Sequence, residues 1–163
     1  MKHITLLLMA AVTICTNVFA QPRAKNIYTS TTNLNLEVLQ NQAQPVVLNR
    51  TLFAGYNTIC LPMSLSAEQL QAAAKDVQVE RLETIRQEGN TLSMYFLDCT
   101  NEGIEAGVPY LIFSPTFQTL HANTQNSLGI STELRSISKT DGAGNAITFG
   151  SSWEMLKVEG RYG

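Results

Sequence analysis

Residues 77–97, VQVERLETIRQEGNTLSMYFL, contain two runs of strand-forming residues on either side of a turn sequence, EGN, at residues 88–90. In the second run Leu92, Met94 and Phe96 alternate with side chains that would point to the other side of a strand. This alternation predicts a strand with one apolar face. The two runs with the turn between them predict an antiparallel β-hairpin.

Similar short runs recur on both sides of this hairpin, separated by Gly, Pro, Asn and Asp residues that favour turns. We expect strands at residues 34–38, 46–53, 58–61, 108–113, 129–137, 146–149 and 153–158. One helix is predicted over residues 67–75, where Ser66 and Gln69 have the spacing of a capping box. The sequence therefore predicts a mainly β fold, an antiparallel β-sandwich or open barrel with one short helix near residues 67–75.

The N-terminal twenty residues have the composition of a secretory signal peptide. Lys2 precedes an apolar run at residues 4–14, and the sequence VFA at residues 18–20 fits the site that a signal peptidase recognises. We therefore expect export and cleavage after residue 20. The alternative is a lipoprotein signal with Cys15 as the acylated residue. Ile14 argues against it, because the residue before a lipidated cysteine is normally small.

Cleavage at that point leaves a polar leader at residues 21–33 and a single β-rich domain at residues 34–163. No transmembrane span is expected, because no apolar run approaches the about 18 to 20 residues that cross a bilayer. The last predicted strand is followed only by EGRYG at residues 159–163. We therefore expect a domain that is truncated at the C-terminus or needs a partner strand, with an exposed sheet edge through which copies self-associate.

The charge and the cysteines limit the partners and the chemistry. Without Lys2 the chain has ten basic and thirteen acidic residues and no run of Lys or Arg. Neither nucleic acid nor an anionic membrane surface is therefore expected as a partner. Cys60 and Cys99 do not form a CxxC pair. In an oxidising compartment they are candidates for a disulfide, and the alternative is two buried thiols.

Two segments carry a resemblance to a known family. Residues 55–63 are GYNTICLPM and residues 103–112 are GIEAGVPYLI, with the predicted helix and hairpin between them. From about residue 50 onward the chain resembles a recurring, uncharacterised β-rich domain of secreted and surface proteins of Bacteroidetes. That domain has a W-N-T-L-C-L-P-F strand and an I-x-A-G-x-P-Y-L-I strand. Tyr56 stands here where tryptophan is usual, and Met63 where phenylalanine is usual.

The resemblance implies a place and an architecture but no active site. We expect a periplasmic, outer-surface or extracellular protein of a Gram-negative bacterium. The leading hypothesis is a non-catalytic exported module, a structural, adhesive or ligand-binding part of a cell-envelope or surface protein. A glycan or another envelope protein is the expected partner, and no cofactor is expected.

Aromatic residues are the candidate ligand-binding groups. Trp153, Tyr56 and Tyr95, together with Tyr110, can stack on sugar rings, because an aromatic side chain offers apolar area with a polar edge. For Trp153 core packing is the competing interpretation, since it alternates with Met155 along one predicted strand.

The alternative function is a carbohydrate-active hydrolase that uses acidic residues of the 98–105 loop, namely Asp98, Glu102 and Glu105. A solvated loop explains these residues better, because acidic residues are mostly exposed unless they are paired. His121 is the only histidine left after cleavage, and we expect it in a loop without a catalytic role. The turn DGAGN at residues 141–145 has alanine at the second position of a calcium loop. We therefore expect no catalytic residues and no metal.

Overall fold

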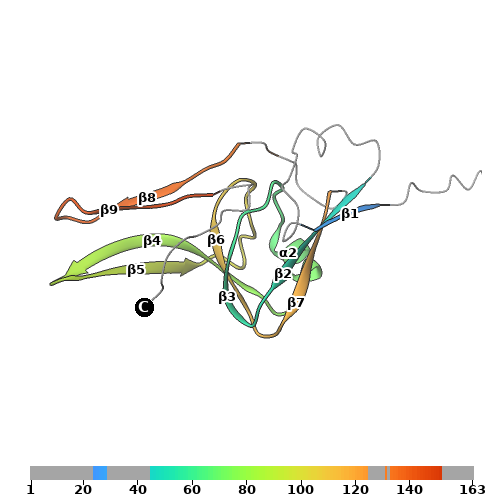
Figure 1. The fold of residues 1–163 in the computed structure, drawn as a ribbon, viewed down its shortest axis with the longest axis horizontal. Coiled ribbons are helices and arrows are strands. Elements are labelled where there is room, and N and C mark those ends of the chain that lie inside the picture. Colours follow the sequence, from blue (N-terminus) through green and yellow to red (C-terminus); the bar gives the residue numbers. More distant parts are fainter. Residues whose placement is uncertain (1–23, 29–44, 125–130, 132, 152–163) are drawn as a thin grey trace, which may run out of the picture.

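The protein folds into two β-sheets with a short helix and a projecting pair of hairpins (Figure 1). The computed structural model describes residues 24–28, 45–124, 131 and 133–151. The strands predicted at 34–38 and 153–158, and Trp153 with them, lie outside these residues. The elements are β1 (Lys25–Tyr28), β2 (Val46–Leu52), β3 (Gly55–Ile59), α2 (Ala67–Ala73), β4 (Gln78–Glu88), β5 (Thr91–Asp98), β6 (Tyr110–Ser114), β7 (Gln118–Asn123), β8 (Ile137–Thr140) and β9 (Ala146–Phe149).

Sheet A has the strand order β1-β2-β7 and sheet B the order β3-β6-β4-β5, while β8 and β9 form a separate hairpin. All pairs are antiparallel except β1 with β2, which is parallel. None of the described sheets closes on itself. The predicted mainly β fold with one short helix is confirmed, and the open sheets agree with a sandwich rather than a barrel.

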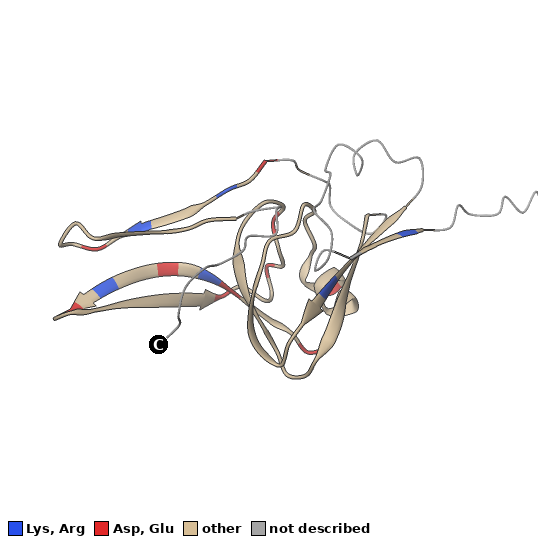
Figure 2. Cartoon of the chain, viewed as in Figure 1, with Lys and Arg blue, Asp and Glu red and all other residues tan. Residues whose placement is uncertain are grey.

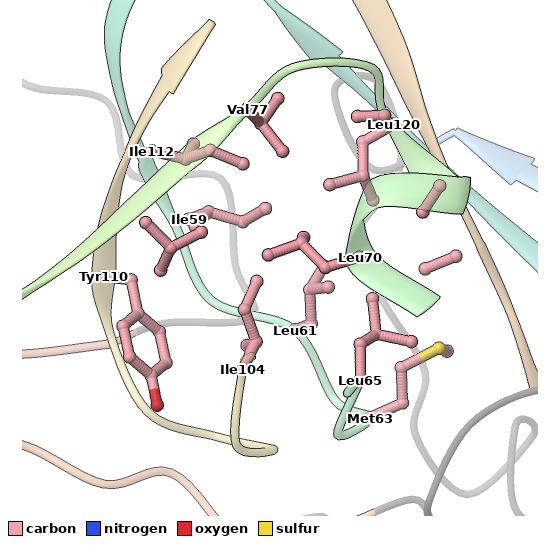
Figure 3. Packing of buried hydrophobic residues seen from close by; sticks show 14 of the residues in the cluster. Ile59, Leu61, Met63, Leu65, Leu70, Val77, Ile104, Tyr110, Ile112 and Leu120 are labelled. Atoms are coloured by element: carbon pink, nitrogen blue, oxygen red, sulfur yellow. The ribbon is translucent and has the colours of Figure 1, made fainter. Parts of the chain in front are cut away.

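The main core lies where sheet A, sheet B and the helix meet (Figure 3). Sheet A contributes Leu48 and Leu120 and sheet B contributes Ile112, all fully buried. Leu70 is the anchor of the helix and lies beside Leu61 in Figure 3. Burying a side chain of this size contributes about 1.5 to 3 kcal/mol, so this cluster is the main source of stability.

The helix begins where the sequence predicts. The Ser66 Oγ accepts a hydrogen bond from the Gln69 N–H at 3.2 Å, and the Gln69 Oε1 accepts one from the Ser66 N–H at 2.8 Å. The capping box is therefore confirmed. The helix ends at Ala73, two residues earlier than expected. Ala74 is already extended, and Asp76 has a φ of 54°, which turns the chain toward β4.

The hairpin of β4 and β5 is also confirmed, with β4 running to Glu88 and β5 continuing to Asp98. Its two-residue turn has a φ of 62° at Gly89 and a negative φ at the next residue, the pattern of a type II′ turn. The hairpin projects beyond the core, and β8–β9 runs alongside it (Figure 1). Leu82 and Ile85 are buried in this arm, and Phe96 contacts Phe149 edge to face at 6.2 Å.

Four strands differ from the prediction. The strand expected at 58–61 is β3, which begins three residues earlier, at Gly55, and ends at Ile59. β1 lies within the segment expected to be a polar leader, and β7 was not expected at all. The strand predicted at 129–137 begins only at Ile137 and continues to Thr140, whereas residues 133–136 are described and are not extended strand. β1 and β7 both pair with β2, so their conformation depends on a neighbouring strand rather than on an alternation of apolar and polar residues in their own sequences.

Within the described residues, no helix combines the length and the apolar character needed to cross a membrane.

Candidate binding surface

Four aromatic side chains gather at one end of the molecule, where sheet A passes into sheet B. Leu52, the last residue of β2, pairs with Gln118, and Gly55, the first residue of β3, pairs with Ser114. The β2–β3 corner and the β6–β7 loop therefore lie side by side, at the bottom of Figure 1. We call the side chains carried here and on the adjoining strand ends, Phe53, Tyr56, Phe113 and Phe117, the aromatic end.

These side chains form two edge-to-face pairs. The ring centroids of Phe53 and Phe117 are 5.7 Å apart, and those of Tyr56 and Phe113 are 5.3 Å apart. Phe53, Phe117 and Tyr56 are 64%, 66% and 61% exposed. Such pairing fixes the rings against each other. Because the rings are not needed in the core, they are available as an apolar contact surface.

A carboxylate on the neighbouring strand fixes the Tyr56 ring. Tyr56 is opposite Phe113, and Phe113 is opposite Gln78, so the register places Glu80 on the same face of sheet B. The Tyr56 hydroxyl donates to the Glu80 Oε1 at 3.1 Å. This hydrogen bond, with the negative charge of Glu80, raises the pKa of Tyr56 above its usual value. The result is an exposed ring with a fixed orientation and a carboxylate at its polar edge.

Side-chain amides hold the corner that carries Phe53. The Asn57 Nδ2 donates to the carbonyl oxygens of Phe53 at 2.9 Å and Gly55 at 3.0 Å. The Phe53 N–H in turn donates to the Asn57 Oδ1 at 3.0 Å. One asparagine therefore satisfies three backbone groups of the corner and limits its motion.

The loop that carries Phe117 is held in the same way. The Gln118 amide donates to the Lys75 carbonyl at 3.0 Å and to the Ser114 Oγ at 2.8 Å, and it accepts from the Lys75 N–H at 2.9 Å. The Ser114 hydroxyl donates to the Thr116 carbonyl at 2.8 Å. The corner at 53–55 and the loop at 115–117 contain no charged residue, and both are tan in Figure 2. Phe53 and Phe117 therefore lie on uncharged loops whose backbones are held by side-chain hydrogen bonds.

Of the predicted aromatic residues, only Tyr56 belongs to this surface. Tyr95 is on the opposite face of sheet B, because Asp98 lies beside Glu80 and Tyr95 is three residues from Asp98 along β5. There its ring lies beneath the Arg86 guanidinium, 5.4 Å from the centroid. Tyr110 is buried in the core, its hydroxyl accepts from the Glu105 N–H, and burial raises its pKa.

Sequence reasoning missed the three phenylalanines. A signal was nevertheless present, because Phe53 precedes Ala54-Gly55 and Phe117 follows Pro115-Thr116. Turn segments of this kind usually carry small or polar residues. A large aromatic residue in such a segment has no reason to be in the core and so indicates a surface role.

The acidic residues of the 98–105 loop have local roles. The Asp98 Oδ1 accepts from the Thr100 N–H at 2.8 Å, and hydrogen bonding to Thr100 lowers the pKa of Asp98. Glu105 forms an exposed ion pair with Arg135 at 3.0 Å. Between them, Ile104 exchanges two backbone hydrogen bonds with Leu65, each 2.8 Å long. The loop therefore closes the core, with the Asp98 and Glu105 carboxylates engaged at its surface and Glu102 exposed.

The two cysteines are separate thiols, of which Cys99 is buried and Cys60 is partly buried. Both Cys60 and Cys99 are free. Cys99 belongs to the main core, where its Sγ is 3.5 Å from the Val79 carbonyl, whereas Cys60 lies outside that cluster beside Ser151. The disulfide candidate is therefore not formed in this structure. Burial raises the pKa of each thiol to about 11, so neither is an activated nucleophile.

His121 lies on β7 rather than in the expected loop. Its Nδ1 is 2.6 Å from the Asn49 Oδ1. The Asn49 Nδ2 in turn donates to the Asn26 side-chain oxygen and to the carbonyl oxygens of Ile27 and Val47. His121 also lines a pocket of about 520 Å³ between α2 and β7, together with Glu68 and Gln69.

That pocket does not have the groups of a catalytic site. Its described lining includes one imidazole and one carboxylate, and neither a serine nor a cysteine. Nucleophilic catalysis needs a nucleophile within reach of a base, and glycoside hydrolysis needs two carboxyl groups. Across the described part of the chain, no three His, Cys, Asp or Glu side chains come together as a metal site would require.

No protein-family model, no curated protein and no solved structure matches this chain. The resemblance to the Bacteroidetes domain therefore stays a prediction, and the case for a function is made from the aromatic end itself.

Proposed function

We propose that this protein is an exported, non-catalytic binding module that holds a glycan at its aromatic end. The observation that carries the proposal is the Tyr56 ring, which is exposed while its edge and hydroxyl are fixed by Phe113 and Glu80. Export follows from the composition of the first twenty residues. We place the module in the envelope or on the surface of a Gram-negative bacterium, as the sequence resemblance implies.

The chemistry of the aromatic end matches that of a sugar ring. A pyranose ring has an apolar C–H face and a rim of hydroxyl groups, so it needs an apolar platform with polar groups at the edge. Tyr56 offers the platform, and the Glu80 carboxylate beside it can accept hydrogen bonds from hydroxyl groups. The second pair, Phe53 with Phe117, extends the apolar area.

The rigidity of the surface supports binding. The Asn57 and Gln118 side chains already hold the two loops in place. A ligand therefore does not have to order them, and less conformational entropy is lost on binding.

The acidic groups support binding over hydrolysis. In the described part of the chain, two carboxylates lie near the Tyr56 hydroxyl: Glu80, which accepts its hydrogen bond, and Asp98, the cross-strand neighbour of Glu80 on β5, which accepts from the Thr100 N–H. A glycosidase needs a pair of carboxyl groups about 5 to 9.5 Å apart on either side of the scissile bond. Asp98 and Glu105 are engaged by Thr100 and Arg135 instead.

A glycan array probed with the purified protein tests the proposal. We expect retention of a limited set of glycans, which are recovered intact. Glu80→Gln removes the charge at the edge of Tyr56 and should weaken the binding. Glu83→Gln, an exposed acid on the same strand, is the matched control and should not. Release of shortened sugars, or equal binding by both variants, would contradict the proposal.

A further inference from the structure

The outer edge of β5 has the features of a pairing surface. β5 is the last strand of sheet B, and its outer edge makes no hydrogen bond with another described strand. Half of the large exposed apolar side chains in the described residues lie on it, namely Leu92, Met94, Tyr95 and Leu97. Met94 is 52% exposed and Leu97 is 45% exposed. Neither lysine nor proline, the usual protections of an edge strand, occurs within residues 91–98.

The turn determines which backbone groups face outward. Glu88 pairs with Thr91 across a two-residue turn, and such a closing pair exchanges both of its hydrogen bonds. Every second residue of β5 from Thr91 onward therefore directs its N–H and C=O toward β4. Cys99 is an even number of residues from Thr91. Its N–H donates to the Val79 carbonyl at 2.8 Å, as this alternation requires. The backbone groups of Leu92, Met94 and Phe96 point away from β4, to the open edge.

We propose that β5 pairs antiparallel with β5 of a second copy of this chain, with Met94 opposite Met94 at the two-fold axis. Antiparallel pairing joins outward-facing residues to outward-facing residues. The register centred on Met94 pairs all three of them, because Leu92 then lies opposite Phe96 of the second copy. Sheet B becomes one sheet that continues through both copies.

The side chains of β5 are complementary to themselves in this register. Leu92, Met94 and Phe96 share one face, so the pairing forms an apolar ladder across the axis. Asp98 is the only charged residue of the strand, and it lies opposite Asn90 of the second copy rather than opposite another carboxylate. An acidic partner strand would find no complementary charge here, and a basic one would find only Asp98 at the end of the strand. The pattern therefore favours a second copy as the occupant.

The dimer goes beyond the binding function and does not depend on it. The aromatic end is formed by β3, by β6 and by the loops beyond them. These strands lie toward the opposite edge of sheet B from β5. Pairing through β5 leaves both aromatic ends open, so one dimer presents two binding surfaces. Ligands on a surface that carries many copies would then be bound with increased avidity.

The first test is the oligomeric state of the purified protein, measured by sedimentation equilibrium. We expect a dimer for the wild-type protein and a monomer for Met94→Lys, which places two lysines opposite each other at the axis. Phe117→Lys introduces the same charge at an exposed aromatic residue outside β5 and should remain a dimer. A monomeric wild-type protein, or a Met94→Lys variant that still dimerises, would overturn the proposal.

The second test fixes the register by oxidative cross-linking. Opposite residues of antiparallel strands have Cα atoms about 4.5 to 5.5 Å apart, within the about 4.4 to 6.8 Å that a disulfide spans. Met94→Cys should therefore give a disulfide-linked dimer in high yield. Leu92→Cys lies on the same edge but opposite Phe96, so it should give little more cross-linking than the wild type. Equal cross-linking by the two variants would refute the register.

Discussion

Replacing Gly103 with alanine should break the contact that closes the core. Gly103 has a φ of 84°, and a Cβ placed there would lie 2.1 Å from the Leu65 carbonyl oxygen. The left-handed backbone costs a non-glycine residue about 1 to 2 kcal/mol. The overlap with backbone adds about 1 to 3 kcal/mol. The overlap also pushes apart Leu65 and Ile104, whose hydrogen bonds contribute about 1 kcal/mol each. We expect a loss of about 4 to 7 kcal/mol in the free energy of unfolding.

Gly89→Ala is the matched control. Gly89 also has a positive φ, 62°, but a Cβ there would meet nothing within 4 Å. This variant should lose only about 1 to 2 kcal/mol. Urea denaturation followed by far-UV circular dichroism gives both values. If the two variants lost the same free energy, the loop at 99–107 would not close the core as described, and its acidic residues would need another explanation.

Three further changes test the packing and the thiols. Ser66→Ala removes the cap that holds the Gln69 N–H and should cost about 1 kcal/mol in urea denaturation; unchanged stability would contradict the cap. Leu70→Ala leaves a cavity beneath the helix and should cost about 2 to 5 kcal/mol, whereas a cost below 1 kcal/mol would show that the helix is not anchored there. The pKa of Cys60 and Cys99 is raised from 9.0 to about 11, so the unfolded chain releases these protons first. The free energy of unfolding should therefore fall between pH 9 and pH 11, and it should fall less in Cys60→Ser; an equal fall would contradict the assignment.

Local patterns were sufficient to predict the elements that depend on neighbours in the sequence. The hairpin of β4 and β5 follows from alternation and from a glycine in its turn. The helix follows from Ser66 and Gln69, three residues apart. The end of the helix could not be predicted in this way, because nothing in the sequence of the turn indicates that Asp76 adopts a left-handed conformation.

The aromatic end depends on contacts between distant segments, which the sequence does not reveal. Tyr56 was predicted as a ligand-binding residue, but Phe113 joins it only because β3 pairs with β6. Phe53 meets Phe117 because β2 pairs with β7, a strand that the sequence did not predict. The same holds for Met94, which is on the apolar face of its strand yet exposed, since β8–β9 lies mainly against β4.

The central claim is that the exposed Tyr56 ring binds a sugar, and the affinity of one array-selected glycan for two tyrosine variants tests it most directly. Truncating an aromatic anchor costs about 2 kcal/mol or more. Tyr56→Ala should therefore bind the glycan more than about 10-fold more weakly in isothermal titration calorimetry. Tyr95→Ala, which removes an exposed tyrosine from the opposite face of the same sheet, should bind as the wild type does. Equal affinity of Tyr56→Ala and wild type would contradict the account.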